Sequence, residues 1–186
     1  MVAVFPQKHL TDLAEWHRMG EAGIFPPDAH LELIEGEILT MAPIGFNHAG
    51  HVHRLNRIFA RLWDKGLDTR IQSPIQLGDL SEPEPDLALV KADANDYTTR
   101  HPITSDVLLL AEVSDSTLRF DKTTKLRLYA SHGIPEYWVV NLIDNCLEVY
   151  RQPQQSGYLQ QTIYQSGDCL SLLALPDIQI VVKDIL

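Results

Sequence analysis

The sequence predicts a mixed α/β (α+β) fold in which helices flank a central β-sheet. Short apolar runs bounded by turn residues fill the middle of the chain, at residues 70–77, 85–90 and 107–113, and such runs are typical of strands. The last of them, VLLLAEV, is continuously apolar, which favours a strand buried on both faces. The predicted order is helix, hairpin, helix, several strands, helix and strands, and this order indicates a sheet covered by helices.

Length and composition set the organisation expected for the chain. With 186 residues and 45% hydrophobic content, residues 1–186 are expected to form a single domain with one core. The N-terminal stretch has no signal-peptide pattern, and the longest apolar run is far shorter than the roughly 20 residues that cross a bilayer. The two cysteines show no disulfide pattern, which favours a reducing compartment. We therefore expect a cytoplasmic protein that has no contact with membranes.

The N-terminal part of the chain is expected to contain two helices and a hairpin. Thr11 is the candidate N-cap of a first helix. Residues 31–41 (LELIEGEILTM) alternate around Glu35 and Gly36, which predicts a β-hairpin. Residues 47–65 have one apolar stripe and one basic face, which predicts an amphipathic helix.

The C-terminal part is expected to contain one helix and the remaining strands. Residues 121–131 have a helical pattern that stops near Gly133 and Pro135. Strands are predicted at 137–141 and 146–150, joined as a hairpin, and edge strands at 162–167 and 178–182.

Two acidic residues stand at the ends of predicted strands. Asp86 opens PDLALV, and Glu112 lies near the end of VLLLAEV, where an ionised side chain is costly to bury without a partner. Two carboxylates on neighbouring strands form a hard oxygen site suited to Mg²⁺ or Mn²⁺. Taken singly, Asp86 is more often a turn residue, Glu112 is as often a structural group, and Lys125 is most often a solvated helix lysine.

In combination, these residues resemble a known signature. Pro85-Asp86 opens one strand and Glu112-Val113-Ser114 ends another, as in the PD-(D/E)XK motif of restriction-endonuclease-like nucleases. The run from Glu112 to Tyr150 is also similar to a family of small bacterial restriction endonucleases. Further matching pieces are LELIEGEI, GFNHAGHVHRL, PDLALV and LPDIQIVV, so the resemblance extends from about Thr11 onward. It implies a restriction-endonuclease-like core.

One position departs from the superfamily pattern. The superfamily has a lysine two residues after its second acidic residue, and Ser114 stands there in this chain. In the family that the chain resembles, the lysine lies on the following helix, and Lys125 is the matching position. Tyr129 is one turn further on the same helical face, where it is expected to help fix that lysine.

The resemblance implies a Mg²⁺-dependent endonuclease that hydrolyses phosphodiester bonds in DNA. Asp86, Glu112 and the backbone carbonyl of Val113 would hold Mg²⁺ or Mn²⁺, which activates water and neutralises charge at the phosphate. Lys125 would orient the water or offset developing negative charge. Glu32 matches an acidic residue of the family's early hairpin, as a further ligand or water-orienting group, with a surface charge as the equal alternative. His48 matches a family position and would help to position the site.

The net charge of −10 means that binding to DNA needs a local basic surface. Two candidates are the face Arg54, Arg57, Arg61 and Lys65, and the cluster Arg119, Lys122, Lys125 and Arg127, with a solvated helix face as the alternative.

A zinc site at His48, His51 and His53 is disfavoured, because no HExxH-like pattern accompanies them. By analogy with the superfamily a homodimer is expected, with the strand EYWVV as interface material or as a buried strand.

Two other functions stay open from the sequence. A non-catalytic interaction module that retains the nuclease fold is favoured by Ser114 in place of the usual lysine and by the acidic composition. A metal-dependent hydrolase of a small phosphorylated substrate would explain the acidic composition without a DNA groove. Fold resemblance does not choose among these functions, because one fold hosts several.

Overall fold

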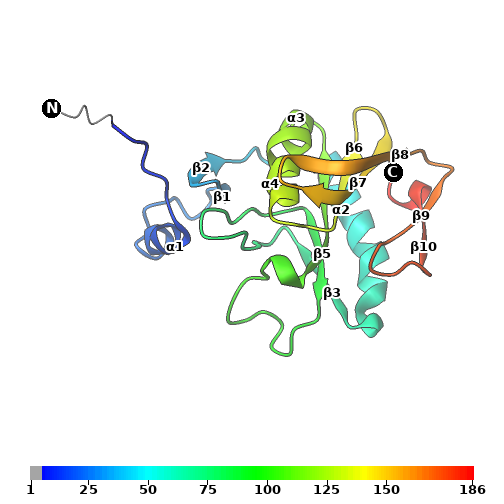
Figure 1. Ribbon diagram of the computed structural model, residues 1–186, viewed down its shortest axis with the longest axis horizontal. Helices are drawn as coiled ribbons and strands as arrows, with labels where there is room; N and C mark the ends of the chain where they lie inside the picture. Colours follow the sequence, from blue (N-terminus) through cyan, green and yellow to red (C-terminus); the bar gives the residue numbers. More distant parts are fainter. Residues whose placement is uncertain (1–5) are drawn as a thin grey trace.

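The computed structural model describes residues 6–186 and is built around a six-stranded mixed sheet (Figure 1). The expected absence of a signal peptide concerns in part residues 1–5, which lie outside the described residues. In this sheet, as described by residues 6–186, β5 and β6 are parallel and the other neighbouring strands are antiparallel. In spatial order the strands are β3 (Leu67–Ile71), β4 (Leu87–Lys91), β5 (Val107–Ser114), β6 (Glu136–Asn141), β7 (Cys146–Gln154) and β8 (Gly157–Tyr164).

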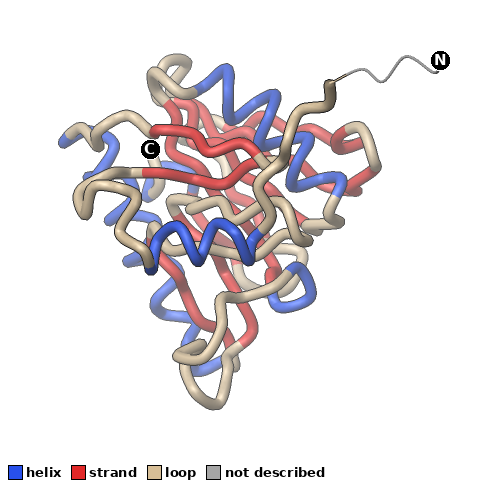
Figure 2. The backbone as a smooth tube through the Cα atoms, turned by 90° about the vertical axis from the view of Figure 1, so that its left-hand side faces the viewer, coloured by secondary structure: helices blue, strands red, loops and turns tan. Residues whose placement is uncertain are grey.

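Helices cover both faces of the sheet, as Figure 2 shows, and this confirms the predicted fold class. On one face, α2 (Phe46–Phe59), continued by a 3-10 turn at Ala60–Lys65, buries Val52, Leu55 and Phe59 against the strands. On the other face, α4 (Leu126–Ser131) buries Leu128 and Tyr129. The spacing of these apolar residues places each set on one side of its helix.

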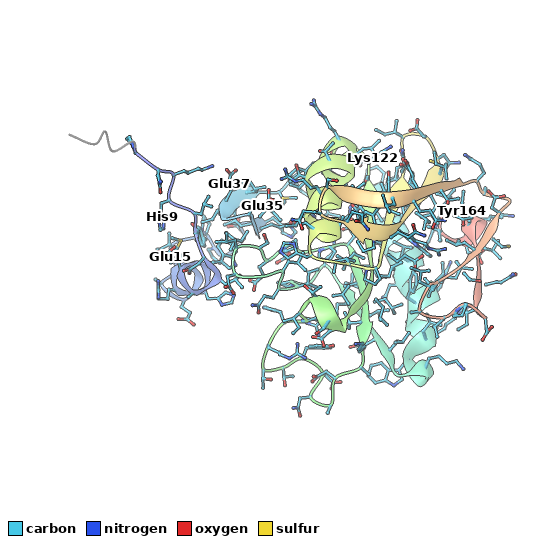
Figure 3. The ribbon with its side chains drawn as sticks, in the orientation of Figure 1. His9, Glu15, Glu35, Glu37, Lys122 and Tyr164 are labelled. Atoms are coloured by element: carbon cyan, nitrogen blue, oxygen red, sulfur yellow. The ribbon has the colours of Figure 1, made fainter. Side chains whose placement is uncertain are left out.

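The N-terminal helix and hairpin form one end of the molecule, opposite β9 (Cys169–Ser171) and β10 (Gln179–Val181) in Figure 1. Helix α1 (Leu13–Glu21) begins with a capping box between Asp12 and Glu15, so its N-cap is Asp12 and not Thr11. Charged groups of this end, among them Glu15 and Glu37, are labelled in Figure 3. The hairpin β1 (Leu31–Ile34) and β2 (Glu37–Thr40) is the predicted one.

The hairpin turn follows from its two central residues. Glu35 and Gly36 both have positive φ, at 49° and 79°, which is the conformation that a tight two-residue hairpin requires. A Cβ at position 36 would also lie 2.6 Å from that of Leu10, so glycine is needed there for space as well.

Two predicted strands differ from the structure. The strand expected at 70–77 is β3 at Leu67–Ile71, because Gln72 has φ of +43° and Pro74 has no backbone N–H to pair. The segment 178–182 does not reach the central sheet: β10 pairs with β9 in a separate two-stranded sheet. The other predicted edge strand lies within β8, which does end the central sheet.

The helix predicted at 121–131 begins earlier and is not uniformly α-helical. It starts with α3 (Leu118–Phe120), passes through a π-helical turn at Asp121–Lys125, and continues as α4. The Leu126 N–H donates to the carbonyl of Asp121, five residues back. Such turns are rare and are frequent at functional sites. Here the turn presents both Asp121 and Lys125 to the interior, where both are buried.

Every residue of β6 is buried, including the EYWVV segment. This segment is therefore a central strand of the core, and it is not exposed as a homodimer interface. Among residues 6–186, no helix has the length and apolar character needed to cross a membrane.

Candidate active site

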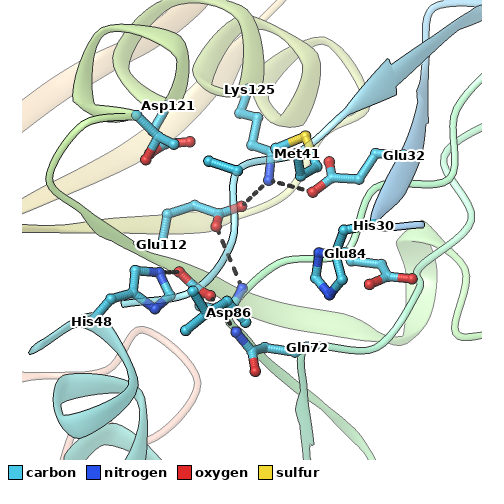
Figure 4. Close-up of a pocket in the computed structure, with 13 residues that line it drawn as sticks. His30, Glu32, Met41, His48, Gln72, Glu84, Asp86, Glu112, Asp121 and Lys125 are labelled. Atoms are coloured by element: carbon cyan, nitrogen blue, oxygen red, sulfur yellow. Dashed lines mark hydrogen bonds and ion pairs between the residues drawn. The ribbon is translucent and has the colours of Figure 1, made fainter. Parts of the chain in front are cut away.

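One pocket of the protein lies where the ends of β4 and β5 meet the helical segment 118–131, the hairpin and the start of α2 (Figure 4). It brings together five residues that the sequence predicts for the site, namely Glu32, His48, Asp86, Glu112 and Lys125. The other lining residues are His30, Met41, Ala42, Ile44, Gln72, Glu84, Thr117 and Asp121.

The register of the sheet places Asp86 beside Glu112. Leu87 pairs with Ala111 across the antiparallel strands β4 and β5, so the next step along the ladder sets Asp86 opposite Glu112. Side chains of opposite residues lie on the same face of a sheet. The Asp86 N–H donates to Glu112 Oε2 at 3.4 Å, and the Val113 N–H donates to Asp86 Oδ2 at 2.8 Å. The backbone thus fixes both carboxylates, which are 7% and 4% exposed.

Lys125 reaches this carboxylate pair from the helical segment. Its Nζ donates to Glu112 Oε1 at 3.0 Å and to Glu32 Oε1 at 3.1 Å. The Tyr129 hydroxyl donates to the same Glu112 oxygen at 2.8 Å. Glu32 is buried, so the surface-charge alternative for Glu32 is wrong, and so is the solvated-lysine alternative for Lys125. Tyr129 holds Glu112, and not the lysine itself.

Asp86 is held by two further side chains. His48, in the first turn of α2, places Nε2 2.9 Å from Asp86 Oδ2, and Gln72 donates from Nε2 to Asp86 Oδ1 at 3.2 Å. The hydrogen bond to Asp86 raises the pKa of His48 and outweighs the opposing effect of burial. His48 therefore favours its charged form beside the carboxylate.

The pocket contains more acidic than basic groups. Its carboxylates are Glu32, Glu84, Asp86, Glu112 and Asp121, and its one primary amine is Lys125. Burial raises the pKa of Glu112 well above its usual range, because desolvation outweighs the charge of Lys125. Burial lowers the pKa of Lys125, but the carboxylates of Glu112 and Glu32 outweigh burial and raise it. The lysine is thus kept charged, and the pocket favours additional positive charge.

Sequence reasoning missed two acidic residues of the pocket. Asp121 is buried and accepts hydrogen bonds from Ser114 Oγ at 2.7 Å and Thr117 Oγ1 at 2.6 Å. It stands four residues before Lys125, and this spacing alone predicts a shared helical face. Glu84 lies in the proline-rich turn before Asp86, and burial raises its pKa. No pattern in the sequence distinguishes Glu84 from its neighbour Glu82.

The other candidate residues lie apart from this group. The ring nitrogens of His51 contact the backbone oxygens of Asn47 and Leu186, and His53 is exposed. Residues 6–186 contain no cluster of three or more His, Cys, Asp and Glu side chains arranged to hold a metal.

The basic residues of the segment 118–131 do not form a free patch. Lys122 pairs with Glu148 at 2.8 Å, Arg127 pairs with Glu35 at 2.5 Å, and Lys125 is buried in the site. Arg119 is exposed and is in none of the ion pairs found among residues 6–186, so the exposed basic residues of this region are Arg119 and those of the helical segment 46–65.

Comparison with solved structures identifies the class of fold. The chain is similar to the crystal structure of a putative nuclease belonging to DUF820 from Anabaena variabilis, with a TM-score of 0.70 and 15% sequence identity over 90% of this chain and 96% of that chain. The two chains therefore share one fold, a central mixed sheet flanked by helices.

The family follows from the sequence. The model of the Uma2 family, described as "Putative restriction endonuclease", matches residues 13–183. The chain belongs to this family, which confirms the resemblance found in its motifs. No curated protein matches the chain.

Proposed function

We propose that this protein is a metal-dependent endonuclease that hydrolyses phosphodiester bonds in DNA, with Mg²⁺ or Mn²⁺ held at Asp86 and Glu112. The observation that carries the proposal is the buried pair of carboxylates on adjacent strands, with a buried lysine 3.0 Å from Glu112. Membership of a restriction-endonuclease family supports the reaction class. An interaction module would have no need for this costly group of buried charges.

The donor atoms of the site fit a hard cation. Among residues 6–186, Glu112 Oε2 accepts only the 3.4 Å contact from the Asp86 N–H, and Asp86 Oδ1 accepts only from Gln72, so each carboxylate keeps a free lone pair. Within the same residues, Glu32 Oε2 is buried and has no hydrogen-bond partner. Mg²⁺ is usually held by one or two carboxylates together with waters and phosphate oxygens. Such a site requires no preassembled set of three protein ligands.

Each residue of the pocket then has a role that its contacts support. A bound metal supplies an activated water and neutralises charge on the phosphate. Lys125 stays protonated between Glu112 and Glu32, and its ammonium offsets negative charge that develops on the phosphate. The Val113 carbonyl would be a further oxygen donor, as the family resemblance implies. His48 acts as a positioning residue through Asp86.

The acidic composition supports a second candidate, a metal-dependent hydrolase of a small phosphorylated compound. The net charge of −10 repels a polyanion, whereas a small phosphate ester needs only the pocket. For DNA we propose a homodimer, because cutting two strands of a duplex uses two sites. The two candidates are separated by comparing the rate of DNA cleavage with the rate of cleavage of a small phosphodiester such as bis(p-nitrophenyl) phosphate.

The test is cleavage of plasmid and single-stranded DNA with Mg²⁺ or Mn²⁺, alongside calorimetric titration of the metal. Asp86→Asn and Glu112→Gln should each lower cleavage by about 100-fold or more and weaken metal binding. Glu148→Gln is the matched control, because it changes a buried, lysine-paired carboxylate outside the pocket. Wild-type protein that neither binds metal nor cleaves DNA would overturn the proposal, as would full activity in both site variants.

A further inference from the structure

Strand β8, orange in Figure 1, is an open edge of the central sheet. It is the last strand in the sheet order and pairs with β7. Among residues 6–186, no backbone hydrogen bond joins β8 to a segment other than β7. An edge strand of this kind presents a row of backbone N–H and C=O groups without partners, which is a template for pairing with another strand.

The opposite edge of the sheet is less open. No residue of β3 is exposed, whereas four residues of β8 are. Arg70 of β3 lies over the ring of Tyr97, 5.8 Å from its centroid, and Tyr97 is itself buried. The segment around Tyr97 therefore packs beside β3, and β8 is the edge that stays available.

The features that usually keep an edge strand from pairing are absent from β8. Natural proteins protect such edges with charged side chains or with proline. No charged residue or histidine occurs between Arg151 and Asp168, and β8 contains no proline. Two of its exposed side chains are apolar, since Leu159 is 71% exposed and Ile163 is 54% exposed. In a chain with a net charge of −10, two copies can therefore meet at β8 without opposing charges of the same sign across the contact.

The order of side chains along β8 is symmetric about Gln161. Residues 158–164 read YLQQTIY. When two such strands pair antiparallel around a two-fold axis at Gln161, each side chain meets one of its own kind. The pairs are Tyr158 with Tyr164, Leu159 with Ile163, and Gln160 with Thr162. Aromatic, apolar and hydrogen-bonding pairs stabilise antiparallel strands. A two-fold interface needs this self-complementarity, because the same surface lies on both sides of it.

We propose that β8 is the interface of a homodimer, in which two copies pair antiparallel around Gln161 and join their sheets. The inference rests on the homodimer included in the proposed function and adds the surface that forms it. Strands β6 and β7 lie between β5 and this interface, so β5 is roughly 14 Å from β8 by the spacing of strands. Pairing therefore leaves the pocket of each copy complete and open.

The test is sedimentation equilibrium on wild type and on two charge variants that share Ile163→Lys. Leu159→Lys/Ile163→Lys sets lysine opposite lysine on both sides of the axis and should weaken self-association by about 100-fold or more. Leu159→Glu/Ile163→Lys sets glutamate opposite lysine and should return the affinity to within about tenfold of wild type. Ile24→Lys is the control for added charge and should change nothing, because Ile24 is 63% exposed outside β8.

Salt dependence checks the register. Raising the salt concentration should strengthen association of the lysine–lysine variant and weaken that of the glutamate–lysine variant, because screening reduces both repulsion and attraction. A wild type that stays monomeric would overturn the inference. So would a dimer that persists in the lysine–lysine variant, or a glutamate–lysine variant that does not recover. If the lysine–lysine variant does not fold, the glutamate–lysine variant decides: a salt-sensitive dimer supports the interface and a monomer overturns it.

The outcome is separable from that of the nuclease proposal. Cleavage of a single strand per protomer should be unchanged in Leu159→Lys/Ile163→Lys, because no β8 residue lines the pocket. A wild type that dimerises through β8 but does not cleave would support the interface and end the nuclease proposal. A wild type that cleaves as a monomer would overturn the interface and leave the nuclease proposal standing.

Discussion

Two buried carboxylates of this protein are each paired with a lysine of the same helical segment, yet their environments differ. Glu148 in β7 is 1% exposed, and both of its oxygens are fully used. Its donors are Lys122 and Asn141 at Oε1, both at 2.8 Å, and Tyr150 and Gln161 at Oε2, at 2.6 and 3.0 Å. In the part of the chain that the structure describes, Glu112 has two donors on one oxygen and only a 3.4 Å contact on the other.

The pKa values of the two carboxyls shift in opposite directions for this reason. Burial raises the pKa of Glu148, but hydrogen bonds from Lys122, Tyr150 and Asn141 outweigh it and hold the pKa below 4.5. Burial of Glu112 is not compensated by Lys125, and its pKa is raised. A carboxylate with a complete set of donors stabilises the fold. One that lacks part of that set, in a pocket with other acids, is suited to bind a cation.

The two lysines provide the sharpest test of this difference. Lys125→Met should lower metal-dependent cleavage by about 100- to 1000-fold, the usual effect of removing one group that stabilises transition-state charge. Lys122→Met should leave cleavage unchanged, because the ion pair of Lys122 is with Glu148, which lies outside the pocket. Single-turnover rates measure both. Equal losses in the two variants would mean that Lys125 acts only through folding.

The stability of the fold should depend more on Glu148 than on Glu32 in the pocket, the reverse of the order expected for cleavage. Glu148→Ala should lower the free energy of unfolding by about 2–5 kcal/mol, because it removes the acceptor of the buried Tyr150 hydroxyl and of one N–H of the Asn141 amide. Glu32→Gln should change it by about 1 kcal/mol or less, since the amide oxygen of glutamine can still accept from Lys125 and Glu32 Oε2 has no partner among residues 6–186 to lose. Urea unfolding gives both values. A larger cost for Glu32→Gln would contradict the comparison.

Metal should stabilise the protein through the pocket only. At a metal concentration of about 100 times Kd, binding to the folded state adds about 2.7 kcal/mol, which is roughly 5 to 10 °C in Tm for a chain of this size. The double variant Asp86→Asn/Glu112→Gln should lose this shift, and Glu148→Gln should keep it. Calorimetric melting with and without Mg²⁺ checks the outcome. A shift that survives in the double variant would place the cation elsewhere.

The smallest expected effect is on the loss of folding stability at acidic pH. A carboxyl whose pKa is lower in the folded state contributes stability that is present above its ordinary value of 4.5 and is lost as the pH falls through the folded value. Wild type should therefore lose stability more steeply below pH 4.5 than Glu148→Gln does. Urea titrations at neutral pH and below 4.5 measure the difference. Parallel curves for the two proteins would show that Glu148 does not carry this linkage.

Those features of the fold that depend on local sequence patterns could be predicted from the sequence. The hairpin turn at Glu35 and Gly36, the buried strand β5 and the helix after it all follow from residue periodicity and turn chemistry. Periodicity also places Asp86 and Glu112 at strand ends. It does not give the register of β4 against β5, which sets these two side chains opposite each other.

Other features depend on contacts between distant segments. The chain leaves β3 at Gln72, but Ile75 and Leu77 beyond it are still buried. Because these residues continue the apolar pattern, the sequence predicted a longer strand than the sheet contains. The burial of Glu32 results from packing of the hairpin against the helical segment 118–131, and no local pattern encodes it. The same is true of Glu148, whose complete set of donors comes from four places in the chain.

The π-helical turn at Asp121–Lys125 has a consequence for how the chain tolerates changes in length. A π-helical turn contains one residue more than an α-helical turn, so a one-residue deletion there would close it into a regular helix and leave α3 and α4 in place. Residues inside the turn would shift by one position relative to the pocket, whereas Leu128 and Tyr129 would keep their places in the core. A one-residue change of length in this turn would therefore alter the lining of the pocket before it alters the fold.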